Sequence, residues 1–126
     1  MNTEQEYRER FIQLLRVMYE VRDKGKGFGL WEWYVKGNNE CGTTACVIGW
    51  AAMDPWFNKQ GLRLNKAGIP IISQGAMSTG WFAVREFFDV SSERADELFT
   101  GYRSLDSVIK RIEIYVKNRF EYQIVY

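Results

Sequence analysis

The chain has 126 residues, of which 46% are hydrophobic and 16% aromatic, so it is long enough to bury one core and too apolar to remain disordered. Its 17 basic and 16 acidic residues give a net charge of +1, which argues against a DNA mimic and against a strong non-specific nucleic-acid binder. It contains no histidine, which excludes Ser-His-Asp and Cys-His mechanisms and most catalytic zinc sites.

These properties predict one domain over residues 1–126 that is not an enzyme and has no catalytic residue, metal or cofactor. The N-terminus, Met1 to Glu6, is polar and acidic and has neither the basic start nor the hydrophobic stretch of a signal peptide. The longest apolar runs are far shorter than the roughly 18 residues that cross a bilayer. We therefore expect a cytoplasmic protein with no membrane contact.

The first segment has the pattern of an amphipathic helix. Thr3-x-x-Glu6 is a capping box, in which each side chain binds a backbone N–H at the helix start. Apolar residues then recur at helical spacing, at Tyr7, Phe11, Leu14, Leu15, Met18 and Val21. The helix is predicted to end near Lys24-Gly25.

Residues 24–40 predict an irregular segment. Lys24 to Gly29 holds three glycines and two lysines but lacks the Walker spacing, which favours a flexible turn over a phosphate loop. Trp31, Trp33 and Tyr34 follow. Such aromatic residues either close one edge of a core or form an exposed stacking surface.

The most informative segment runs from Cys41 to Ala52 and predicts a buried helix. From about Thr43 to Met53 nearly every side chain is apolar, and a helix without a polar face belongs at the centre of a fold. A glycine inside a helix costs about 1 kcal/mol relative to alanine, so Gly49 indicates the close approach of another element. We expect Gly49 and Trp50 to be buried and the first and last helices to clasp this one.

The middle of the chain predicts a short helix and a hairpin. Asp54-Pro55 interrupts the central helix, because the residue before proline avoids the α conformation. A second short helix then ends at Gly61. Leu62–Leu64 and Ile69–Ile72 flank a turn and predict a hairpin, with Pro70 confining its strand to an edge.

The C-terminal part predicts three helices and a tail. The first runs from Gly80-Trp81 to Phe88, with Trp81, Val84, Phe87 and Phe88 facing inwards. Ser91 is the expected N-cap of the second, Ser92–Thr100. The last begins at Ser104 or Asp106 and has its core stripe at Leu105, Val108, Ile109, Ile112, Tyr115 and Val116. The tail Tyr122–Tyr126 is apolar and suits either an added strand or a contact arm.

The predicted fold class is mainly α (α+β): a compact helical domain around a buried central helix, with a small β hairpin. Residues 28–112 also resemble a family of uncharacterised small proteins of bacteria and their phages. The resemblance is carried by Phe28-Gly29-Leu30-Trp31-Glu32-Trp33, by the block Cys41-Gly42-Thr43-Thr44-Ala45-Cys46-Val47-Ile48-Gly49-Trp50-Ala51, and by Ser91 to Phe99. It implies a fold of this kind and a mobile-element origin, and it brings no activity with it.

One candidate ligand site follows from the predicted start of the central helix. The first turn of a helix has unpaired backbone N–H groups that bind anions, although ordinary capping by Thr43 explains the same residues. Cationic and aromatic side chains precede this turn and could bind a phosphate and stack on a base. The site residues are Gly42, Thr43, Thr44, Lys24, Lys26, Trp31 and Trp33.

The two cysteines, Cys41 and Cys46, suit either two small buried side chains or a redox pair. The favoured function is that of a non-enzymatic binding protein, with a role as a phage or mobile-element accessory in counter-defence. It would block a partner protein or sequester a small anionic, nucleotide-like ligand. The sequence leaves open whether the protein forms a homo-oligomer. The alternatives are a nucleic-acid-binding regulator, in which the last two helices imitate a helix-turn-helix, and a small enzyme of unknown reaction.

Overall fold

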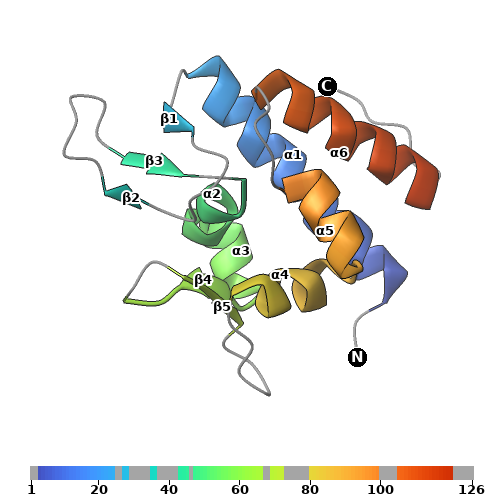
Figure 1. Cartoon of the computed structure of the whole chain (residues 1–126), viewed down its shortest axis with the longest axis horizontal. Helices are drawn as coiled ribbons and strands as arrows, with labels where there is room; N and C mark the ends of the chain where they lie inside the picture. Colours follow the sequence, from blue (N-terminus) through green and yellow to red (C-terminus); the bar gives the residue numbers. More distant parts are fainter. Residues whose placement is uncertain are drawn as a thin grey trace.

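The computed structural model describes residues 3–24, 27–28, 35–36, 43–45, 47–66, 69–72, 80–99 and 105–120. These residues form a mainly helical domain with short strands (Figure 1). The helices are α1 (Glu4–Asp23), α2 (Val47–Met53), α3 (Pro55–Lys59), α4 (Gly80–Phe88), α5 (Ser92–Phe99) and α6 (Leu105–Phe120). The strands are β1 (Gly27–Phe28), β2 (Val35–Lys36), β3 (Thr43–Ala45), β4 (Leu62–Leu64) and β5 (Pro70–Ile72). The predicted fold class is confirmed.

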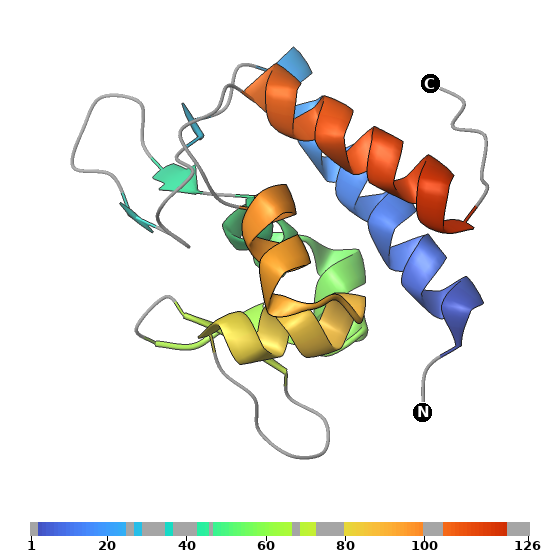
Figure 2. The ribbon, with the colours of Figure 1, turned by 45° about the vertical axis from the view of Figure 1, so that its right-hand side comes forward.

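The long helices α1 and α6 lie side by side and run in opposite directions (Figures 1 and 2). α1 begins as predicted, because the Thr3 and Glu6 side chains both bind backbone N–H groups at the helix start. Its apolar face is fully buried from Phe11 to Val21. α1 packs against α6, α2 and α4, so it is the element around which the core is assembled.

The central helix is shorter than predicted. It begins at Val47, because Thr43–Ala45 form β3, the middle strand of the sheet β1-β3-β2. Thr44 pairs with Gly27 on a parallel neighbour and with Val35 on an antiparallel one. Threonine is β-branched and suits a strand, and the ladder on both sides supplies backbone partners that a helix would otherwise provide. The sheet also corrects the prediction that residues 24–40 are wholly irregular.

The burial of α2 is largely as predicted, while its neighbours differ. Val47, Ile48, Gly49, Ala51 and Ala52 are buried. Trp50 is only half-buried and packs against the edge of the core, which corrects the expectation that it is buried. α2 packs mainly on α1, α3, β3 and the hairpin β4–β5, and α6 reaches the core mainly through α1. The expected clasp of α2 by both terminal helices is therefore wrong.

The buried position of Gly49 supports a stability prediction. Gly49→Leu adds four carbon atoms inside a packed core and is expected to lower the free energy of unfolding by about 1–3 kcal/mol. Urea unfolding of the variant against wild type measures the change. An unchanged unfolding midpoint would show that the site has room for a side chain.

The remaining elements follow their predicted positions with one exception. Asp54 caps α3 by accepting the Phe57 backbone N–H at 3.4 Å, and Gly61 has the left-handed φ of +101° that ends this helix. β4 and β5 form the expected antiparallel hairpin. Trp81 was expected inside, but its side chain is 37% exposed. Along the part of the chain that the structure describes, no helix is long and apolar enough to cross a membrane.

Candidate functional site

The structure does not place the predicted anion site at a helix start. Thr43 and Thr44 lie in the middle strand β3, so their backbones are in a sheet ladder. Lys24 caps the end of α1, and its ammonium pairs with the Glu20 carboxylate at 3.1 Å. Four predicted site residues lie outside the described residues: Lys26, Trp31, Trp33 and Gly42. Both cysteines and the tail Tyr122–Tyr126 also lie outside them. Thr43 and Thr44 therefore do not form the first turn of a helix that could bind an anion.

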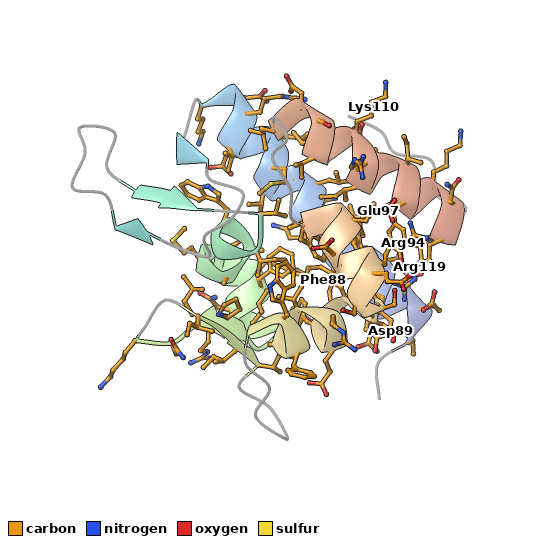
Figure 3. All side chains as sticks on the ribbon, in the orientation of Figure 1. Phe88, Asp89, Arg94, Glu97, Lys110 and Arg119 are labelled. Atoms are coloured by element: carbon orange, nitrogen blue, oxygen red, sulfur yellow. The ribbon has the colours of Figure 1, made fainter. Side chains whose placement is uncertain are left out.

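A different candidate site lies between α5 and α6, where the structure has a groove of about 750 Å³. We call it the α5–α6 groove. Its walls are α5 and α6, and residues from the start of α1 and from the connection between α4 and α5 complete the lining. Figure 3 shows Glu97, Arg94, Arg119 and Asp89 following one another along this boundary. It is lined by Glu4, Asp89, Val90, Ser91, Arg94, Glu97, Leu98, Arg111, Ile114, Tyr115, Asn118 and Arg119.

Arg119, on the last turn of α6, organises one end of the groove. Its guanidinium donates to the Phe88 carbonyl at 3.0 Å, to the Asp89 carbonyl at 3.1 Å and to the Tyr115 hydroxyl at 3.0 Å. It also forms a two-point ion pair with Glu4, at 2.8 and 3.3 Å, and contacts the Asp89 carboxylate at 3.2 Å. The side chain is only 14% exposed, so α1, α4 and α6 are joined at a largely buried cation.

The helix α4 ends in a way that places these carbonyls. Asp89 has a left-handed φ of +53°, and the Val90 N–H bonds back to the Arg85 carbonyl at 3.1 Å, which is the six-residue bond of a Schellman motif. Carbonyls at a helix end have no partner within the helix and attract cations. The buried Arg10 of α1 donates to the Phe87 carbonyl at 2.7 Å. Arg10 and Arg119 therefore close the C-terminus of α4 from two helices.

Burial and pairing change the acid–base properties of these groups. Burial lowers the pKa of Arg10, whose guanidinium also lies 3.9 Å from the centre of the Phe87 ring. The hydrogen bond from Arg119 lowers the pKa of the Glu4 carboxyl below its usual value. Because the folded-state pKa of Glu4 is lowered, its pairing stabilises the protein at neutral pH, and this contribution is lost as the pH falls through that pKa.

The left-handed conformation of Asp89 predicts a difference between two substitutions. Asp89→Ala and Asp89→Gly both remove the carboxylate, but only alanine has to place a Cβ atom at a φ of +53°. We expect Asp89→Gly to be more stable than Asp89→Ala by about 1 kcal/mol. Paired urea-unfolding curves at neutral pH measure this difference. Equal stabilities would mean that the end of α4 rearranges when the carboxylate is removed.

Two further arginines contact Glu97 along the groove, away from the Arg119 cluster. Arg94 pairs with the Glu97 carboxylate at 3.1 Å, and its guanidinium lies 5.2 Å from the centre of the Tyr115 ring. Arg111, on the first half of α6, donates to the Glu97 backbone carbonyl in a long bond of 3.4 Å. A guanidinium has five N–H donors, so both arginines have donors that these bonds do not use.

An apolar side chain lies between the two ends. Ile114 is 52% exposed, on the face of α6 that carries Arg111, Asn118 and Tyr115 into the groove. Leu98 and Val90 line the same hollow from α5 and its connection. The groove thus combines an exposed aliphatic surface with charged groups at both ends, which is the arrangement of a binding site rather than of a packed core.

Sequence reasoning missed this site because it is formed by two helices. One signal was available: Arg111, Ile114 and Asn118 recur at helical spacing beside the core stripe, which puts a large aliphatic side chain on the polar face of α6. Arg10 had a similar signal, since it is four residues before Leu14 on the buried face of α1. A cation at such a position requires a buried acceptor, and the end of α4 supplies it.

Within the described residues, no cluster of three or more histidine, cysteine, aspartate or glutamate side chains could hold a metal ion. No protein-family model matches this chain, and no curated protein or solved structure matches it significantly.

Proposed function

We propose that this chain is a non-enzymatic binding protein that blocks a partner protein by holding a segment of it in the α5–α6 groove. The observation that carries the proposal is the exposed Ile114 in a hollow of about 750 Å³ whose two ends are charged. Binding pockets typically enclose about 300–1,000 Å³ and combine apolar walls with a few polar groups. Interfaces likewise place an apolar anchor at the centre and polar groups at the rim.

A protein partner suits this groove better than a small anionic ligand. Glu4, Asp89 and Glu97 lie in the groove beside its three arginines, so a small anion would meet carboxylates as well as guanidinium groups. A peptide segment carries apolar and charged side chains together and can match both. The role as a phage or mobile-element accessory in counter-defence is part of the proposal, and its support is the resemblance of the block from Cys41 to Ala51.

The exposed aromatic side chains of α4 form the main competing surface. Phe82 is 71% exposed and Trp81 is 37% exposed. The Arg85 guanidinium lies 5.4 Å from the centre of the Phe82 ring and covers part of it. Neither aromatic residue lines the groove, and small groups of exposed hydrophobic residues are common on protein surfaces. The concave groove is therefore the favoured interface.

Site-specific photocrosslinking in the cells that encode the protein tests this proposal. A benzoylphenylalanine at position 114 is expected to trap one partner protein, whereas the same group at the exposed position 110, also on α6 but outside the groove, is expected not to. The trapped protein is then purified and its affinity measured by calorimetry. Ile114→Gln should weaken binding at least tenfold, because an apolar anchor at an interface contributes about 2 kcal/mol.

Lys117→Gln is the matched control, since Lys117 is exposed on the same helix and does not line the groove. Its affinity for the partner should equal that of wild type. Equal trapping at positions 110 and 114, or equal affinities for Ile114→Gln and wild type, would contradict the proposed function.

A further inference from the structure

The two ends of the α5–α6 groove carry opposite local charge. Toward one end, Arg94 pairs with the Glu97 carboxylate, whereas Arg111 donates to the Glu97 backbone carbonyl, so two guanidinium groups accompany one carboxylate. At the other end, the single guanidinium of Arg119 lies between the carboxylates of Glu4 and Asp89. Figure 3 shows Arg94 and Glu97 on one side of Arg119 and Asp89 on the other along the boundary of the two helices. One end therefore has an excess cation and the other an excess anion.

The bonds at the two ends also differ in how easily an incoming charged group can replace them. Arg94 and Glu97 are about half-exposed partners three residues apart on one helix, which is a weak type of ion pair. Among the described residues, Arg111 holds only a long bond to a carbonyl oxygen. Arg119, by contrast, is largely buried, and its guanidinium binds acceptors on α1, α4 and α6. An incoming carboxylate can thus be bound at the Arg94–Arg111 end without breaking the fold.

The spacing of these groups along α6 determines how far apart the matching side chains must lie in a peptide bound in the groove. Arg111 and Arg119 are eight residues apart, which is about 12 Å along a helix that rises 1.5 Å per residue. Ile114 is between them, about 4.5 Å along the axis from Arg111. An apolar anchor on Ile114 would therefore be flanked by groups of opposite charge on its two sides.

From this arrangement we infer that the groove selects an amphipathic peptide segment with a fixed charge order. An acidic side chain binds the unused N–H donors of Arg111 and Arg94, an apolar side chain packs on Ile114, and a basic side chain meets the exposed carboxylates of Glu4 and Asp89. The inference rests on the proposed function and names the chemistry of the partner segment. The charge order also fixes the direction in which the segment lies, because a reversed segment would place like charges together at both ends.

A displayed library of random peptides tests the charge order. The immobilised full-length protein selects binders, and those that also bind Ile114→Gln are removed. The remaining peptides are expected to share an apolar residue with an acidic residue on one side and a basic residue on the other. Their affinity for Arg111→Glu should be at least tenfold lower than for wild type, since a carboxylate then faces the acidic residue.

Lys110→Glu makes the same charge change on the exposed surface of α6 beside the groove and should leave the affinity within about twofold. If the peptides depend on Ile114 but show no charge order, or bind Arg111→Glu as they bind wild type, the inference is overturned while the proposed function stands. If no selected peptide depends on Ile114, the inference also falls. In that case crosslinking at position 114 decides separately whether the proposed function survives.

Discussion

Phe11→Ala is expected to lower the free energy of unfolding by about 3–5 kcal/mol, the largest loss for any single truncation considered for this fold. Phe11 is fully buried on α1. Its ring centre lies 4.9 Å from that of Phe88, 5.2 Å from that of Tyr115 and 6.0 Å from that of Phe120. Removing the ring therefore leaves a cavity where α1, α4 and α6 meet, and it removes several aromatic contacts at once.

Phe82→Ala is the control for this prediction, because Phe82 is 71% exposed and its truncation is expected to cost no more than about 0.5 kcal/mol. Chemical unfolding followed by tryptophan fluorescence measures both variants. A loss under about 2 kcal/mol for Phe11→Ala would show that the core around α1 closes over the cavity, and it would contradict the packing described above.

Arg119→Met is expected to lower the free energy of unfolding by about 2–4 kcal/mol. Methionine preserves much of the aliphatic packing but leaves the Phe88 carbonyl and the Tyr115 hydroxyl without the donor they have now. Glu4 and Asp89 are well exposed and regain water, so their ion pairs with Arg119 account for the smaller part of the loss. The greater part comes from the unbonded end of α4.

Two other variants separate these contributions. Arg111→Met is the matched control on the same helix. Within the part of the chain that the structure describes, Arg111 makes only a long bond to Glu97, so the change should stay within about 0.5 kcal/mol. Arg119→Lys keeps the charge, but an ammonium with three donors cannot bind the six acceptor oxygens of the guanidinium, so it should recover less than half of the loss. Equal stability of Arg119→Met and Arg111→Met would show that the α4 terminus does not need its cation.

The elements with local signals were predictable from the sequence. The capping box at Thr3 and Glu6 gave the start of α1, and Asp54-Pro55 marked the boundary between α2 and α3. Ser91 accepts the Arg94 backbone N–H at 3.1 Å, as expected for the N-cap of α5. In each case the stabilising contact lies within a few residues, so it could be read without knowing the tertiary structure.

The predictions that failed concern features that depend on residues far away in the sequence. Thr43–Ala45 adjoins an apolar run that fits a helix, and it becomes a strand because β1 and β2 pair with it on both sides. Those neighbours are two residues long, which is too short to show a period of two. The α5–α6 groove was missed for the same reason, because Glu4 and Arg119, which pair in it, are 115 residues apart in the sequence.

Chemical-shift mapping of the isotope-labelled protein, titrated with the partner trapped at position 114, tests most directly that the α5–α6 groove is the binding surface. The amide signals of Val90, Leu98 and Ile114 are predicted to shift on binding, while those of Trp81 and Phe82 on α4 stay in place. Shifts centred on Trp81 and Phe82, with the groove signals unchanged, would contradict the account and assign binding to the aromatic surface of α4.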